Sequence, residues 1–401
     1  MSRALRVAAA DALESLLSQE GWAHASALPV EAGDTGRFHA LFGRDSLVVA
    51  LQVLNVRPDV APATLRALAA RQGARENPET EEEPGRILHE YRPLPPARLV
   101  EQGWPLGDDG GLCYYGSSDA TSWFLVVLDA TGDARLQAEL AHSRQAAGAW
   151  LEEALRRGGG LVRCGPRVSP GGLAQQGWRD CLDPAADPFG GGIVAADGSM
   201  PASPLADADS QAAAVAALDA LTRLDVERQP HWVRLRDRLR ERVGRDFAPD
   251  VMARDGADRV VPGAGSQLGW LLWSGALSEQ AAGAAVERLS RPDVHTKYGV
   301  RTLSTDHCSF RADGYHRGAV WPFDCWFAWG GLRASGAHGL ADQVRDGVRR
   351  ALAALGRYPE LYSVSRSGEL AAIPVANRVQ AWTVGAALAF ETGWDGRTQA
   401  T

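Results

Sequence analysis

Clusters of arginine, histidine, carboxylate and aromatic residues recur along this sequence, and together they could bind a sugar. An aromatic ring can stack on the apolar face of a sugar ring, while charged side chains exchange hydrogen bonds with its hydroxyls. Taken singly, each cluster has an ordinary explanation, such as a helix N-cap or a solvated loop carboxylate. Their recurrence in nearly every long loop favours a shared site. The clusters lie at 42–46, 85–90, 114–119, 176–183, 299–304, 314–322, 358–362 and 380–382.

The acidic residues of two of these clusters could cleave a glycosidic bond. That reaction requires two carboxyl groups on opposite sides of the anomeric carbon. One donates a proton to the leaving oxygen, and the other activates water or attacks directly. The third long loop carries Asp180 and Asp183, and the last carries an isolated Glu360. We therefore expect one of the two aspartates to face Glu360 across a pocket.

Helices must position these residues, because alternating β-branched runs are scarce and the best strand candidates are short pieces near 86–91 and 161–164. Apolar residues at helical spacing predict twelve helices, separated alternately by short joints and long loops. Twelve helices can form six inner and six outer members of a closed ring, with long loops forming a mouth. We expect one (α/α)6-barrel domain over residues 1–401. The predicted helices span 3–19, 47–54, 59–71, 119–130, 133–156, 206–223, 228–245, 265–274, 277–289, 318–335, 338–355 and 377–391.

Composition and charge exclude several classes of protein. The 42 basic and 49 acidic residues give a net charge of −7 without a basic stripe, which argues against a nucleic-acid binder. No apolar run approaches the roughly 20 residues that span a bilayer, and no signal-peptide pattern opens the chain. We therefore expect a cytoplasmic protein without a membrane partner. Five scattered cysteines indicate neither a disulfide framework nor a metal knuckle.

The ordered series of motifs resembles the catalytic domain of bacterial glycogen-debranching-enzyme-like amylo-α-1,6-glucosidases, a group related to the glucosidase I and mannosylglycerate hydrolase family. The resemblance extends over roughly residues 36–392. The motifs that carry it are Phe42-Gly43-Arg44-Asp45, Gly85-Arg86-Ile87-Leu88-His89-Glu90, Tyr115-Gly116-Ser117-Ser118-Asp119, Gln176-Gly177-Trp178-Arg179-Asp180-Cys181-Leu182-Asp183, Tyr315-His316-Arg317-Gly318-Ala319-Val320-Trp321-Pro322, Pro359-Glu360-Leu361 and Gln380-Ala381-Trp382.

This resemblance implies an (α/α)6 barrel that hydrolyses α-glycosides with inversion, with a carbohydrate substrate as its partner. It makes the aspartate of the third loop the general acid, with Asp183 favoured over Asp180, and Glu360 the general base. Such chemistry requires no metal and no cofactor, because it consists of proton transfer and attack by water. The implied substrate-binding residues are Phe42, Arg44, Asp45, His89, Glu90, Asp119, Trp178, Tyr315, His316, Arg317, Trp321, Gln380 and Trp382.

The sequence departs from the pattern in two places. Helix-forming sequence begins at Ser2, which leaves no room for the N-terminal β-rich domain of larger debranching enzymes, and segment 204–211 lacks the expected pattern of an acidic residue followed by an aromatic one. A small α-glycoside therefore becomes as good a candidate substrate as glycogen. Two alternatives stay open: a sugar isomerase or epimerase that uses His89, His307 and His316, and a carbohydrate-binding protein without catalysis. We expect a monomer or a small homo-oligomer.

Overall fold

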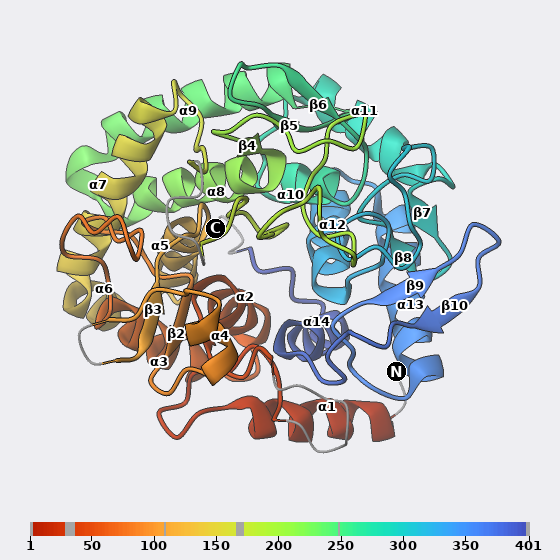
Figure 1. The fold of residues 1–401 in the computed structure, drawn as a ribbon, viewed down its shortest axis with the longest axis horizontal. Coiled ribbons are helices and arrows are strands. Elements are labelled where there is room, and N and C mark those ends of the chain that lie inside the picture. Colours follow the sequence, from red (N-terminus) through yellow and green to blue (C-terminus); the bar gives the residue numbers. More distant parts are fainter. Residues whose placement is uncertain (1–2, 29–36, 108–109, 166–171, 248, 398–401) are drawn as a thin grey trace.

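Six helices form an inner ring in the computed structural model, which describes residues 3–28, 37–107, 110–165, 172–247 and 249–397. Each packs against the next in chain order, and the last packs against the first, so the ring closes (Figure 1). Nearly every residue of these helices is buried, because a neighbour covers each face. The inner helices are α2 (Gly43–Val53), α5 (Ala120–Ala130), α8 (Ala208–Leu224), α10 (Gln267–Trp273), α12 (Pro322–Ala334) and α14 (Ala381–Thr392).

Six outer helices surround this ring, each packed against an inner one. They are amphipathic: in the outer helix 229–246, for example, only Trp232, Leu239, Val243 and Asp246 are buried. The architecture is the expected (α/α)6 barrel. The outer helices are α1 (Arg3–Leu16), α3 (Val60–Ala69), α7 (Ala141–Arg157), α9 (Gln229–Asp246), α11 (Glu279–Ser290) and α13 (His338–Leu355).

All twelve expected helices are present, with changes at their ends. The stretch 133–156 breaks at Leu140 into α6 (Ala134–Glu139) and α7. Helix α12 begins only at Pro322, because the preceding Val320 pairs with neighbouring extended segments and proline is tolerated in a first helical turn. The short α4 (Ala97–Glu101) and the single-turn η1 (Val226–Arg228) were not expected.

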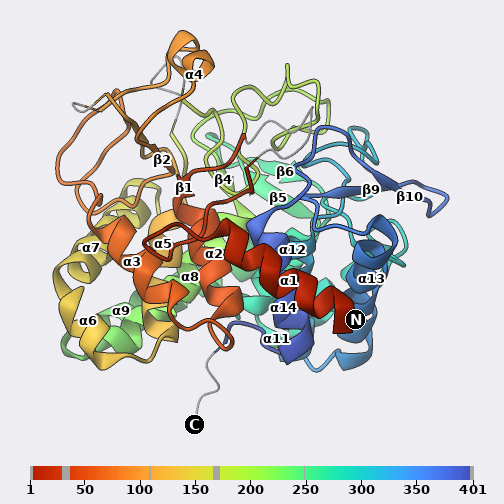
Figure 2. The ribbon, with the colours of Figure 1, turned by 90° about the horizontal axis from the view of Figure 1, so that it is seen from below.

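The long loops lead from an outer helix to the start of the next inner helix, so they gather at one end of the barrel (Figure 2). The expected strand near 86–91 is β2, displaced by a few residues, whereas the one near 161–164 is reduced to a single antiparallel bridge between Cys164 and Leu205. There the side chain of Gln211 hydrogen-bonds the backbone N–H and carbonyl of Val162, which satisfies both groups without a strand partner. The loops contain small antiparallel sheets with strands β1 (Leu41–Phe42), β2 (Glu90–Arg92), β3 (Leu112–Tyr114), β4 (Ala206–Asp207), β5 (Val251–Arg254), β6 (Val260–Pro262), β7 (His295–Thr296), β8 (Gly299–Val300), β9 (Tyr362–Val364) and β10 (Leu370–Ala372).

A glycine permits a close contact between two inner helices. A Cβ atom at Gly269 of α10 would lie 2.5 Å from the Cα of Ala328 on α12. That distance is far below van der Waals contact, so any side chain here would push the two helices apart. The crossing of α10 and α12 therefore depends on this residue.

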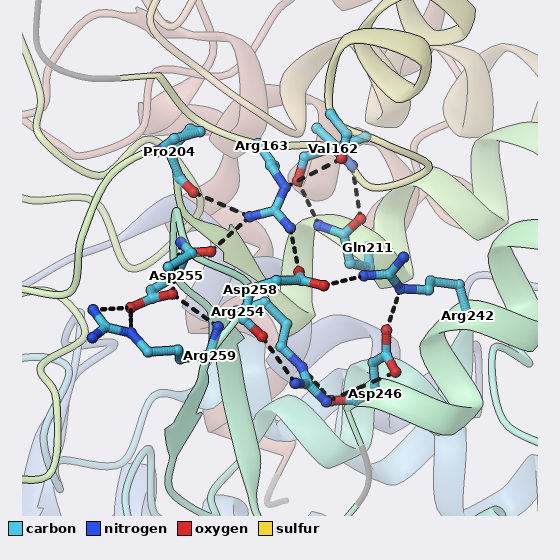
Figure 3. Close-up of polar contacts among 12 residues, drawn as sticks. Val162, Arg163, Pro204, Gln211, Arg242, Asp246, Arg254, Asp255, Asp258 and Arg259 are labelled. Atoms are coloured by element: carbon cyan, nitrogen blue, oxygen red, sulfur yellow. Dashed lines mark hydrogen bonds and ion pairs between the residues drawn. The ribbon is translucent and has the colours of Figure 1, made fainter.

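An ion-pair network fastens the β5–β6 hairpin to the loop before α8 and to α9 (Figure 3). Asp258, at the tip of the hairpin, lies 2.6 Å from a guanidinium nitrogen of Arg163 and 2.7 Å from one of Arg242. Arg163 also donates to the backbone carbonyls of Pro204 and Asp255. The network holds the start of α8 in place from outside the barrel.

Candidate active site

A pocket of about 410 Å³ opens among the loops at the mouth of the barrel. Its lining comes from five of the long loops and combines carboxylates, arginines and apolar side chains. Six residues singled out from the sequence contribute to it: Phe42, His89, Glu90, Asp180, Asp183 and Tyr315.

Arg44, in the first turn of α2, ties three loops together beside this pocket. Its Nε lies 2.8 Å from Asp119, its Nη1 lies 3.0 Å from Asp180, and its Nη2 donates to the carbonyl of Gln176. Burial opposes its charge, but the nearby carboxylates outweigh that effect and raise the pKa of Arg44. Arg44 therefore fixes Asp180 and stays charged.

The two aspartates of the third loop have different environments. The Asp180 side chain is 29% exposed and is held by Arg44. Burial raises the pKa of Asp180, while Arg44 lowers it. Asp183 is exposed and accepts hydrogen bonds from the N–H groups of Ala185 and Ala186, as in an Asx turn.

Glu360 comes from the last loop, just before β9, and is only 2% exposed. The Tyr315 hydroxyl donates to its Oε1, and the backbone and side-chain N–H groups of Asn377 donate to its Oε2 at 3.1 and 3.2 Å. Burial raises the pKa of Glu360 to about 7; these donors oppose the rise, and the charge of Asp180 adds to it. The charge of Asp180 acts on Glu360, and the charges of both act on Asp45, so the loops bring these carboxyls into one region.

A third buried carboxyl, Asp45, lies among these groups. Burial raises its pKa to about 8, Arg44 lowers it, and the charges of Asp180, Glu360 and Asp119 raise it further. Carboxyls concentrated in this way cannot all be ionised at once. The site can therefore hold a proton at neutral pH.

The side of the pocket formed by β1 and β2 carries Phe42, His89 and Glu90. Phe42 pairs with Glu90 across the two strands, and its ring meets that of His89 edge to face at 5.5 Å. Burial and the nearby arginines lower the pKa of His89 well below its usual value, so this imidazole is neutral. Glu90 pairs closely with Arg92.

The three expected indoles lie behind the pocket. Trp178, Trp321 and Trp382 are buried and belong to one aromatic cluster, in which Trp382 stacks on Phe323 at 3.8 Å and Trp178 meets Trp321 at 5.5 Å. Among the described residues of the pocket lining, Tyr315 is present and the indoles are not. The Trp321 ring N–H donates to the Tyr315 carbonyl, so the cluster supports the pocket from within.

The other expected binding residues also make contacts inside the protein. His316 stacks on Trp321 and accepts a hydrogen bond from the N–H of Gly192, and Arg317 donates to loop carbonyls, one of them that of Gly191. Gln380 accepts from the Asn377 side chain, and Asp119 holds Arg44. These contacts position loop segments around the pocket.

Two arginines that line the pocket, Arg37 and Arg98, were not among the residues singled out from the sequence. The charge of Arg37 lowers the pKa of both Asp180 and Glu360, which places it beside both carboxyls. The Arg98 side chain is largely exposed to solvent. Its partial burial and the positive charges of Arg37 and Arg92 lower its pKa. Neither forms an ion pair with a carboxylate of the described residues. Only their position in loops that carry other site residues could have indicated them.

Within the described part of the chain, no group of three His, Cys, Asp or Glu side chains is arranged to hold a metal ion, and no helix is long and apolar enough to cross a membrane.

Comparison with known proteins gives a family match and structural matches. Residues 195–362 match the mannosylglycerate hydrolase MGH1-like glycoside hydrolase domain, a range that includes Tyr315 and Glu360. No curated protein sequence matches the chain. The GH63 mannosylglycerate hydrolase from Thermus thermophilus, in complex with Tris and D-glycerate, has a TM-score of 0.67 at 16% identity, over 97% of this chain and 100% of that one. The same enzyme in complex with glucose has a TM-score of 0.65 at 17% identity, with the same shares covered.

The expected resemblance is thus confirmed in its mannosylglycerate hydrolase branch: residues 195–362 match that glycoside hydrolase domain, and the chain shares the fold of a GH63 mannosylglycerate hydrolase.

Proposed function

We propose that this protein is an inverting hydrolase of short α-glycosides, with Asp180 as general acid and Glu360 as general base. The observation that carries the proposal is that Asp180, from the third long loop, and Tyr315, which donates a hydrogen bond to Glu360 of the last long loop, line the same pocket; the charge of Asp180 also raises the pKa of Glu360. Hydrolysis of a glycosidic bond with inversion needs a general acid and a general base that act on the same sugar from different sides.

Asp180 is the better candidate for the acid. Its carboxyl is held by Arg44 next to the other carboxyls, whereas Asp183 is exposed and its Oδ1 accepts the hydrogen bonds of a turn. Binding of a sugar would displace water from Asp180 and favour its protonated form, which donates to the leaving oxygen.

Glu360 acts in its ionised form. Three hydrogen bonds from Tyr315 and Asn377 fix its carboxylate, so that it can take a proton from a water molecule attacking the anomeric carbon. Asp45, buried among these groups, is suited to bind sugar hydroxyls. Arg44 then orients the acid instead of contacting the sugar directly.

The arginines at the pocket favour a substrate with an acidic leaving group. Arg37 and Arg98 offer guanidinium groups to a carboxylate. The structural relative that binds D-glycerate is a mannosylglycerate hydrolase, which is consistent with such a substrate. We propose α-glycosides of carboxylate-bearing alcohols as substrates, with glucosyl and mannosyl glycerates as the simplest members to test, ahead of branched glucan.

A substrate panel with three matched variants tests this function. Methyl α-glycosides, α-glucosylglycerate, α-mannosylglycerate and limit dextrin are incubated with the protein, and released sugar is measured together with its initial anomer by NMR. We expect release of the β-anomer from a glycosylglycerate, at least about 10³-fold slower in Asp180→Asn and Glu360→Gln. Asp183→Asn serves as control and should keep most of the activity. Equal activity of all three variants, or release of the α-anomer, would contradict the assignment.

A further inference from the structure

We propose that the natural leaving group is larger than glycerate: an alcohol with an apolar, ring-sized body that carries a carboxylate. This inference rests on the proposed function and adds the chemistry of the part of the substrate that leaves.

Exposed apolar side chains surround the mouth of the pocket. Leu182 is 40% exposed, Phe189 46% and Val375 52%, and all three line it. They come from two different loops, with Leu99 and Trp104 of a third loop in the same lining. Large apolar side chains that converge on a pocket from separate loops are typical of a ligand contact.

The backbone holds the most prominent of these side chains in place. The N–H of Phe189 donates to Asp187 at 2.8 Å, and its carbonyl accepts from the N–H of Tyr315 at 2.8 Å. The phenyl ring is therefore presented to the pocket by a segment fixed on both sides. A fixed contact loses little conformational freedom when a ligand binds.

The apolar residues flank the proposed catalytic carboxyls. Leu182 and Phe189 belong to the same loop as Asp180, and Val375 lines the same pocket. A general acid protonates the oxygen that leaves, so the leaving group lies on the side of Asp180. The apolar rim is therefore placed to contact the leaving group.

A positive charge at the mouth of the pocket could bind the carboxylate of the proposed leaving group. Arg98 is adjacent to Leu99 in sequence, both line the pocket, and Arg98 pairs with no carboxylate of the described residues. The carboxylate of glycerate can bind a guanidinium group, but glycerate has no apolar part that could contact Phe189 and Val375. An aromatic or cyclic alcohol with a carboxylate uses both features.

Benzyl, 4-carboxybenzyl and glycerate α-glycosides of one sugar test the proposal, because all three leave as aliphatic alcohols after protonation by the general acid. We expect kcat/KM to be at least about tenfold higher for the 4-carboxybenzyl glycoside than for the other two. Phe189→Ala and Val375→Ser should each lower this value by about three- to tenfold and change the glycerate glycoside less than twofold. Val226→Ser, an exposed valine on η1 outside the pocket, is the matched control and should change neither. A preference for glycerate, or equal losses on both substrates, would overturn the inference.

Binding separates this inference from the proposed function. Calorimetry measures the affinity of the free alcohol, 4-(hydroxymethyl)benzoate, without any reaction. If no glycoside is cleaved but this alcohol binds and Phe189→Ala weakens it, the proposed function is wrong, while the recognition of a carboxylate-bearing ring by the pocket stands. If glycosides are cleaved and the alcohol does not bind, the inference is wrong and the function stands.

Discussion

Replacing Glu360 by glutamine should change how the stability of the protein depends on pH. Burial raises the pKa of Glu360 from 4.5 to about 7, so the unfolded chain ionises this residue before the folded protein does. The contribution of Glu360 to stability is therefore fully present below about pH 4.5 and is lost as the pH rises through about 7. Glutamine does not titrate and has nearly the same shape.

The size of the effect follows from the shift. Each pKa unit corresponds to about 1.4 kcal/mol, so the free energy of unfolding of Glu360→Gln should rise relative to wild type by about 3 kcal/mol between pH 4.5 and pH 8. Urea unfolding at several pH values measures this difference. Glu369→Gln, at an exposed position of the β9–β10 hairpin, is the control and should show no such trend. If the difference in the free energy of unfolding between Glu360→Gln and wild type does not change with pH, the idea that burial destabilises the ionised form of Glu360 is refuted.

Three further changes should affect stability. Arg44→Met leaves the buried Asp119 and the partly exposed Asp180 without their cation and should lower the free energy of unfolding by about 3–5 kcal/mol, measured in urea. Gly43→Ala places a Cβ atom against the carbonyl oxygen of Leu88, well inside van der Waals contact, and should lower the melting temperature by several degrees in a thermal scan. Asp258→Ala removes the exposed ion pairs of the hairpin, including that with Arg163, and should cost only about 1 kcal/mol; a larger loss would show that the network is more than a surface contact.

The fold could be predicted from the sequence because the pattern of apolar residues along each helix reflects the helix's position in the barrel. Helices such as α5 and α14 are apolar on every face, and helices such as α9 are apolar on one face, which distinguishes inner from outer members. Helix ends were less predictable. Nothing local to the sequence shows that residues before Pro322 pair with distant segments.

The candidate site was predictable only in part, because its chemistry depends on environment. Asp180 and Asp183 are equivalent in sequence, and only the structure shows that one pairs with Arg44 while the other supports a turn. Arg37 and Arg98 have no distinctive sequence context, so the positive charge at the pocket appears only once the loops are folded together.

Aromatic residues were the least predictable part. The same ring that can stack on a sugar can also pack in a core, and Trp178 and Trp382 do the latter. The side chains exposed at the mouth are instead Phe189 and Val375, in loop positions without a motif. Motifs therefore indicated the region of the pocket, and the structure shows which side chains line it.

The roles of the two carboxyls can be tested most directly with a substrate that needs no general acid. Fluoride leaves an α-glycosyl fluoride without protonation, so Asp180→Asn should hydrolyse the fluoride within about tenfold of wild type, while losing at least about 10³-fold on a glycosylglycerate. Glu360→Gln should lose activity on both substrates, because attack by water still needs its base. Full activity of Glu360→Gln on the fluoride would contradict the account. The account would also be contradicted if Asp183→Asn, and not Asp180→Asn, lost activity on the glycosylglycerate but kept it on the fluoride.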